Sequence, residues 1–300
     1  MNFLVEDTIG QYEQLFSMNN DRDRQDYFRY SMMKPFEKMW ETVNVPLKAK
    51  KPNGYDVIMA TNMLGYLDVS KTDTGKKALE KLKEIQMLET AYNTLDDCIY
   101  FMEKNNLSIN ADRLRFGMYI ADPKKLELQK GYCGFGGIPG FIQVSIYPDS
   151  YNISKIPAVI AHEFNHNIRF SYFDWNHGDV TVGDYIIIEG LAESFAKELY
   201  GEELLGPWVT SFDKEELDYS IEVVKDALDV KGFAEVSSYM FGDKISMEQG
   251  YKPVGLPAFA GYAVGFQVVQ SFMKENNIRI AEATLLETKE IINKCGLFNK

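Results

Sequence analysis

Two of the three histidines in this 300-residue chain, His162 and His166, lie four residues apart in the sequence AHEFNHNIRF. On a helix, this spacing places both imidazoles on one face, one turn apart, where their nitrogens can bind the same metal ion. Glu163 directly follows the first histidine and can meet a water bound to that ion without being a ligand itself. The pattern is HExxH, which indicates a hydrolytic zinc site when it lies on a helix.

The two alternatives to a metal site are a chance match and a pair of ordinary core histidines. A chance match is the risk that any short motif carries. Two histidines and a glutamate on an otherwise apolar helix would be costly to bury without a partner, and metal coordination removes that cost. The sequence therefore predicts a zinc ion bound by His162 and His166, with Glu163 as the general base.

A catalytic zinc usually has three protein ligands and an open position for water, so we expect a third ligand. A metzincin is excluded, because Arg169 and Tyr172 occupy the positions where that pattern has glycine and histidine. Glu189 is favoured, because it lies inside the apolar segment IIIEGLAESFA, where an unpaired carboxylate would be costly. The candidates for this ligand are His177, Asp174, Asp179, Glu189 and Glu193.

Two further residues have predicted roles beside the metal. Glu193 lies one turn after Glu189 and should accept the second ring N–H of a zinc-bound histidine, the alternative being a solvated glutamate. A tetrahedral oxyanion needs a second donor, and Tyr262 in AGYAVGF is the candidate. The alternative for Tyr262 is a core tyrosine bonded to a backbone carbonyl.

Helix signals surround these residues and predict the elements that position them. A helix over residues 154–168 should carry the HExxH pattern, with Ser154 as its N-cap. A second helix should end at Tyr200, before Gly201, and Thr181 has capping-box spacing with the acidic residue three positions later at its start.

Strands are expected at residues 114–121 and 141–147, with a glycine-rich loop over 131–140 between them. The first 106 residues look helical, and the clearest periodicity spans residues 73–105. This change in character suggests a helical region, residues 1–106, followed by the region that carries the motif, residues 107–300. No linker marks the boundary, so one integrated domain is the alternative.

Composition limits the classes of partner. The net charge is −12 and the pI about 4.9, so the surface repels phosphate backbones, and we expect no nucleic-acid binding. The uncharged segment between Lys252 and Lys274 contains proline, glycine and glutamine, which favours a loop and a buried helix over a membrane span. The N-terminus lacks the order of a signal peptide, and the three cysteines are far apart. We therefore expect a soluble, cytoplasmic protein with reduced thiols.

The sequence HEFNH followed by EGLAESFA resembles the HExxH-plus-glutamate zincins, or gluzincins. More closely, it resembles the bacterial YjaZ-type family of predicted zinc-dependent proteases. The segments YMFGD, PAFAGYAVGFQVVQSF and EATLLETKEIINK also match that pattern, so the resemblance covers about residues 110–300.

The resemblance implies an α+β fold, with a zincin-like lobe of a small mixed sheet and an active-site helix, plus extensive N- and C-terminal helices. The strand at 141–147 would be the sheet edge along that helix and could pair with an extended peptide. Glu193 matches a carboxylate that orients the first motif histidine in thermolysin-like enzymes. The expected activity is zinc-dependent hydrolysis of peptides or proteins. The alternatives are hydrolysis of another amide and a zinc-bearing binding or regulatory protein, which would not need Glu163.

Overall fold

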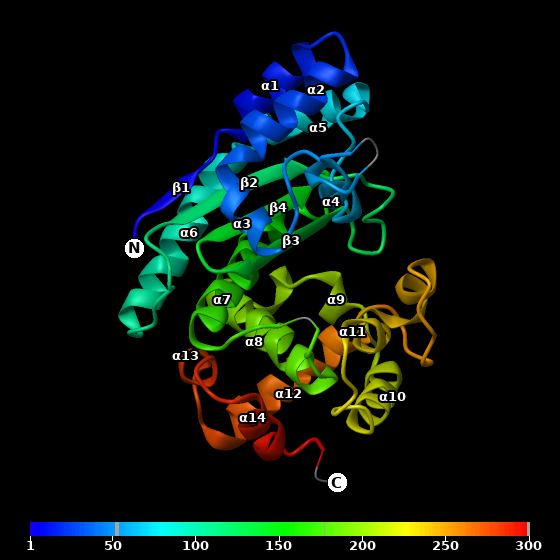
Figure 1. Cartoon of the computed structure of the whole chain (residues 1–300). Coiled ribbons are helices and arrows are strands. Elements are labelled where there is room, and N and C mark those ends of the chain that lie inside the picture. The colour runs from blue at the N-terminus through cyan, green and yellow to red at the C-terminus, as the bar shows by residue number, and fades with distance from the viewer. Residues whose placement is uncertain (52–53, 177, 299–300) are drawn as a thin grey trace. The chain divides into compact units, whose positions relative to one another are not determined.

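The computed structural model describes residues 1–51, 54–176 and 178–298 (Figure 1). Contacts within the chain group it into two compact units. The predicted domain boundary near residue 107 stays a prediction. The sheet unit comprises Met1–Asp97 and Ala111–Ile156, and the site unit comprises Cys98–Asn110 and Pro157–Lys300.

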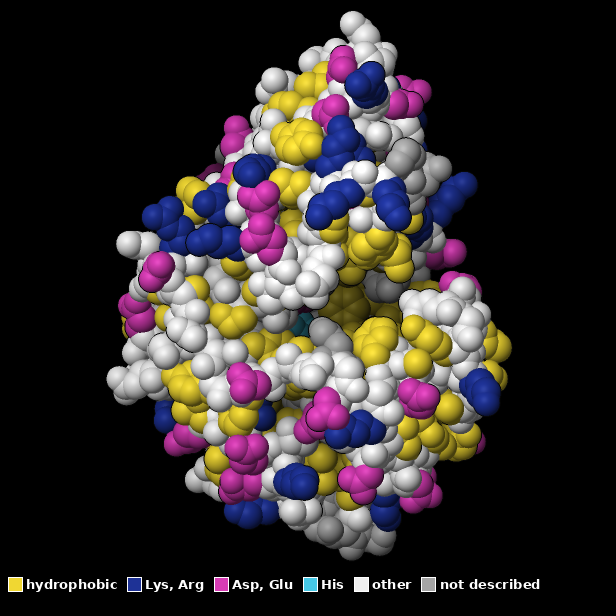
Figure 2. All heavy atoms as spheres, viewed as in Figure 1, with side chains coloured by type: hydrophobic (Ala, Val, Ile, Leu, Met, Phe, Trp, Pro, Cys, Tyr) yellow, Lys and Arg dark blue, Asp and Glu magenta, His cyan; other side chains and the backbone are white. Residues whose placement is uncertain are grey.

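The two units differ in charge. The sheet unit has 19 Lys and Arg residues against 20 Asp and Glu, whereas the site unit has 13 against 24. In Figure 2, dark-blue Lys and Arg side chains gather over the sheet unit. The acidity of the chain therefore belongs almost entirely to the site unit, which disfavours polyanionic ligands there.

The sheet unit contains a four-stranded mixed sheet with the strand order β1-β2-β4-β3. β1 pairs in parallel with β2, β2 pairs in parallel with β4, and β3 pairs with β4 in the antiparallel direction. The two strands predicted from the sequence are confirmed as β2 and β4, and the sheet is small and mixed, as expected. The strands are β1 (Phe3–Val5), β2 (Leu114–Ile120), β3 (Tyr132–Ile138) and β4 (Phe141–Ile146).

Two expectations about this sheet are wrong. The segment expected as a glycine-rich loop, 131–140, mostly forms β3, which turns back at Gly140 (φ 90°) to pair with β4. β4 was expected at the sheet edge, but it lies between β2 and β3, so β1 and β3 are the edge strands. The two errors have one cause: glycines give a strand no side-chain alternation to recognise, and only its pairing with β4 reveals it.

The helices of the sheet unit follow the predicted periodicity with one interruption. The segment 73–105 is helical, but it is divided at Gln86, whose φ of 49° ends one helix before the next begins. β1 is a short strand within the region expected to be helical. α6 contributes residues to both units. The helices are α1 (Thr8–Ser17), α2 (Asp21–Tyr27), α3 (Glu37–Thr42), α4 (Val57–Met63), α5 (Thr72–Glu84) and α6 (Met87–Lys104).

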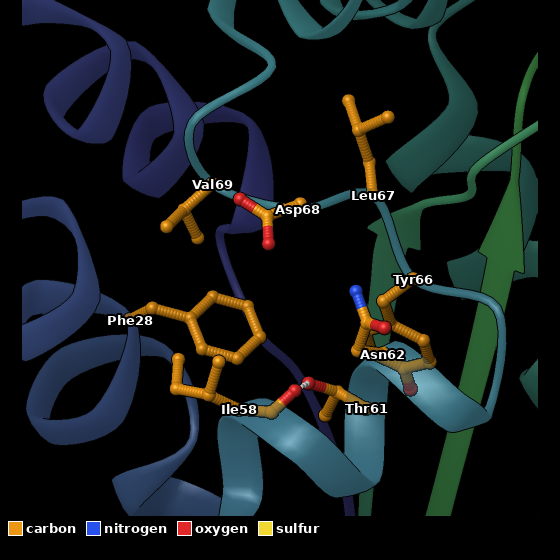
Figure 3. Close-up of a pocket in the computed structure, with 8 residues that line it drawn as sticks. All are labelled: Phe28, Ile58, Thr61, Asn62, Tyr66, Leu67, Asp68 and Val69. Carbon is orange, nitrogen blue, oxygen red and sulfur yellow. Dashed lines mark hydrogen bonds between the residues drawn. The ribbon is translucent and has the colours of Figure 1, made fainter. Parts of the chain in front are cut away.

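A small cavity in the sheet unit has a volume of about 10 Å³, room for about one water molecule. Figure 3 shows Phe28 on one side, α4 below with the Thr61 hydroxyl bonded to the Ile58 carbonyl, and the segment Tyr66–Val69 passing from above Phe28 to the opposite side. This cavity is too small for a substrate.

The site unit is built from helices, and the signals at the start and end of α8 are confirmed. Thr181 Oγ1 accepts from the Asp184 N–H at 3.0 Å, and the Asp184 carboxylate accepts from the Thr181 N–H at 3.2 Å. Gly201 follows the helix with φ 86°. The helices are α7 (Ile156–Tyr172), α8 (Val182–Tyr200), α9 (Pro207–Thr210), α10 (Lys214–Lys225), α11 (Phe233–Glu248), α12 (Ala260–Asn276), α13 (Ile280–Ala283) and α14 (Thr288–Lys294).

The predicted start of α7 is wrong, whereas the prediction of a loop and a helix after Lys252 is confirmed. Ser154 lies in a 3₁₀ turn, Ile153–Lys155, so α7 begins at Ile156 and Ser154 is not its N-cap. The uncharged segment provides a loop and α12, as expected. Across the described parts of the chain, no helix has the length and apolar character needed to cross a membrane.

α12 packs against α8 with almost no space between their backbones. A Cβ atom on Gly190 of α8 would collide with the carbonyl of Gly265 of α12, and a Cβ on Gly265 would collide with the carbonyl of Ile186. Glycine at both positions lets the two backbones touch, which fixes α8 and the acidic residues that it carries.

We expect Gly265→Ala to lower the free energy of unfolding by about 3 kcal/mol, because the obstacle is a backbone carbonyl that cannot rotate away. The matched control is Gly178→Ala, whose methyl group would lie 3.4 Å from Asn176 Oδ1 in a loop and should change stability by less than about 0.5 kcal/mol. Denaturant unfolding measures both. Equal stabilities for the two variants would contradict the close contact.

Candidate metal centre

Two helices supply the polar residues of the predicted site. α7 carries His162, Glu163 and His166, and α8 carries Glu189 and Glu193. The side chains are buried: the two histidines, Glu163 and Glu189 are 5–6% exposed, and Glu193 is 1% exposed. Such burial of polar groups requires that they satisfy one another or bind a further group.

Three donor atoms from these helices converge on one point. His162 Nε2 lies 3.0 Å from His166 Nε2 and 3.1 Å from Glu189 Oε2, and His166 Nε2 lies 3.5 Å from Glu189 Oε2. Tetrahedral zinc with bonds of 2.0–2.1 Å places its ligand atoms about 3.3 Å apart. The separations match that geometry, so these three residues fit a zinc ion.

The other nitrogen of His162 meets a carboxylate. Its Nδ1 lies 3.1 Å from Glu193 Oε1, and the predicted role of Glu193 beside a bound metal stays a prediction. The same oxygen also accepts a hydrogen bond from the indole N–H of Trp208. His166 differs, because its Nδ1 is buried without a hydrogen-bond partner, and its ring stacks on Phe170 with centroids 5.7 Å apart.

The electrostatics of the group favour a cation. Burial by itself lowers the pKa of His162, but hydrogen bonds to Glu189 and Glu193 outweigh this effect and hold the pKa well above its ordinary value. Burial raises the pKa of Glu189, but both histidines outweigh it and lower the pKa to about 2. In the described chain, the ion pairs of Glu189 and Glu193 run only to histidine. A divalent cation would supply the positive charge that these buried carboxylates lack.

A tyrosine outside the predicted set of site residues lies near the same carboxylates. Burial and the charges of Glu189 and Glu163 raise the pKa of Tyr185. Tyr185 is four residues before Glu189 on α8, so helical spacing places both on one face. That spacing is the signal that could have identified it.

Tyr262 contacts Phe241, an aromatic residue that also contacts Tyr185. Its ring centroid is 5.9 Å from that of Phe241, which in turn is 6.3 Å from that of Tyr185. The glycines that flank Tyr262 pack closely on other helices: Gly265 touches α8, and Gly261 touches Met240 of α11. The role of Tyr262 as an oxyanion donor stays a prediction.

Asp174 and Asp179, two further candidate ligands, do not join the three donor atoms. Asp179 is exposed and pairs with Lys231 at 2.5 Å, and Asp174 is exposed. Both line a separate cavity of about 340 Å³ at the end of α7, which includes none of the three donor residues. His177 lies outside the described residues.

These observations define a class: an α+β protein with a buried His-His-Glu group that can bind a metal ion. Comparison with known families then shows to which family the chain belongs. The family described as "Predicted Zn-dependent protease (DUF2268)" matches residues 87–293, and the chain belongs to this family. The family is thus described as zinc-dependent, which agrees with the chemistry of the donor atoms.

Two proteins of Bacillus subtilis (strain 168) are similar to this chain. One is "Uncharacterized protein YjfC", which is 63% identical over 299 residues and is covered, like this chain, over 100% of its length. The other is "Uncharacterized protein YjaZ", which is 27% identical over 144 residues, or 47% of this chain and 51% of YjaZ. The expected relation to YjaZ is therefore confirmed. No solved structure matches significantly.

The raised pKa of His162 leads to a prediction about metal affinity. Without metal, this pKa keeps His162 protonated at neutral pH, so a bound zinc ion must displace the proton. We expect the apparent zinc affinity to rise with pH, about tenfold per unit while the pH stays below this pKa. Chelator competition between about pH 6 and about pH 8 measures the slope, after correction for the chelator.

Glu193→Gln is the informative variant for this prediction. It removes the charge of one of the three carboxylates, Glu189, Glu193 and Glu163, that raise the pKa of His162, so the slope should level off at a lower pH. An ordinary histidine has a pKa of about 6.5, and wild-type affinity that levels off there would contradict the prediction.

Proposed function

We propose that this chain is a zinc-dependent peptidase with a gluzincin-type site. His162, His166 and Glu189 are the zinc ligands, and Glu163 is the general base. The observation that carries the proposal is the convergence of the three donor atoms within 3.0–3.5 Å of one another, with Glu163 beside the first histidine on α7. The family description supports the same activity.

Each residue has a chemical task in this proposal. A zinc ion at this site supplies a Lewis acid that polarises a carbonyl and acidifies water. Glu163 accepts the proton of the attacking water and delivers it to the leaving amine. Glu193 holds the His162 ring through its Nδ1 atom. A binding protein would need the metal ligands but not Glu163, and this difference favours the enzyme.

The substrates proposed are peptides or proteins, as the word protease in the family description suggests. The site unit has 13 basic against 24 acidic residues, so it should attract basic peptides more strongly than acidic ones. A cytoplasmic location stays a prediction.

Glu163→Gln tests the mechanism directly. We expect it to retain zinc, because Glu163 is not a ligand, and to lose almost all hydrolysis, because general-base catalysis contributes about 10²–10⁴-fold. Glu198→Gln, an exposed glutamate on α8, is the matched control and should behave as wild type. Zinc content and cleavage of a peptide library that includes basic sequences are the measurements. Undiminished hydrolysis by Glu163→Gln would remove Glu163 from the mechanism.

A pair of tyrosine variants tests the oxyanion donor. We propose Tyr262 for this role, and Tyr185 is the competing donor because of its proximity to Glu189 and Glu163. Removal of the donor hydroxyl should reduce kcat by about 10²–10³-fold and leave zinc content unchanged. Tyr262→Phe and Tyr185→Phe are therefore compared in the same assay. Wild-type kcat in Tyr262→Phe, with the loss in Tyr185→Phe, would transfer the role to Tyr185.

A further inference from the structure

Trp208 contacts the side chain that holds His162. Its indole N–H donates to Glu193 Oε1, and this same oxygen lies 3.1 Å from His162 Nδ1. Trp208 is 8% exposed and Glu193 is 1% exposed, so water does not compete freely for this oxygen. The three side chains form a continuous hydrogen-bonded chain from α9 through α8 to α7.

The chemistry of indole gives this chain a direction. An indole N–H can only donate, so Glu193 Oε1 must accept from Trp208. His162 Nδ1 then acts as a second donor to the same oxygen. When Nε2 loses its proton, its lone pair faces His166 Nε2 and Glu189 Oε2. Glu193, as an acceptor at Nδ1, favours the tautomer of His162 that a metal ion requires, and Trp208 holds the Glu193 carboxylate in that position.

The local sequence holds Trp208 in this position. α9 is a short helix that starts at Pro207, and Gly206 precedes it. A Cβ atom on Gly206 would collide with the indole ring, so the ring lies directly over the backbone at that glycine. α9 also packs against α12, the helix that touches α8. The indole is therefore fixed by its own chain as well as by Glu193.

We propose that Trp208 is a positioning residue for the metal centre, which acts through Glu193 to orient His162. The inference rests on the proposed zinc site. A carboxylate that orients a zinc-bound histidine typically contributes 10–100-fold to metal affinity. Trp208 acts one step farther away, through a single hydrogen bond to a charged group, and its removal should accelerate zinc loss by about 3- to 10-fold.

Trp208→Phe is the central variant, because it keeps an aromatic ring and removes only the N–H donor. Trp40→Phe is the matched control: Trp40 is 2% exposed, and its Nε1 has no hydrogen-bond partner. The measurement is the rate at which zinc transfers from the loaded protein to a chelator, together with the melting temperature of the metal-free protein. A general loss of packing would lower the melting temperature but leave zinc release unchanged.

A double-mutant cycle separates the proposed route from an independent effect. In a Glu193→Ala background, Trp208→Phe should cause no further acceleration, because the residue through which it acts is gone. If Trp208→Phe does not fold, Gly206→Ala takes its place, since the added methyl keeps the indole and displaces it. Zinc release as slow as in Trp40→Phe, or additive effects in the cycle, would overturn the proposal.

A further variant distinguishes failure of this inference from failure of the zinc site. His162→Ala should abolish tight zinc binding if the proposed site is correct. Zinc retained at the wild-type level in His162→Ala would overturn the proposed function and the role of Trp208 with it. Zinc lost from His162→Ala, with slow release from Trp208→Phe, would overturn only the inference about Trp208.

Discussion

The burial of two imidazoles and their carboxylate partners between α7 and α8 is the constraint on which the site depends. Ionised groups in a protein interior cost several kcal/mol each unless they are paired. In the described part of the chain, Glu189 and Glu193 form ion pairs only with histidine. The group therefore needs positive charge, and either a proton on His162 or a divalent cation can provide it. Protons therefore compete with a metal ion for His162, because either one supplies the positive charge that the group needs.

Rigid placement of α8 gives this group its geometry. α8 is buried on nearly all sides, and contact with α12 through Gly190 and Gly265 leaves it no room to shift. A site whose side chains project from packed helices keeps its distances better than one carried by loops. α12 also packs against α9, which carries Trp208, so one helix supports both Glu189, the proposed ligand, and the donor to Glu193.

The sequence by itself determined the parts of the site that depend on helical spacing. His162, Glu163 and His166 lie on one helix, and the four-residue spacing alone places the two imidazoles together. The capping box and Gly201 bounded α8 correctly, because these signals act within one turn of the chain. Glu189 was selected as the third ligand from its apolar surroundings, and the structure places its carboxylate beside both histidines. These features are local, so a single sequence contains them.

Only the tertiary structure decided which distant residues meet. Trp208 reaches Glu193 across a turn that contains no recognised motif. β3 formed in a segment whose glycines resemble a loop, because hydrogen bonds to β4 define a strand where side chains give no pattern. The same pairing moved β4 from the sheet edge to its interior. Contacts between residues far apart in the chain depend on packing and shape, and spacing along one sequence does not encode them.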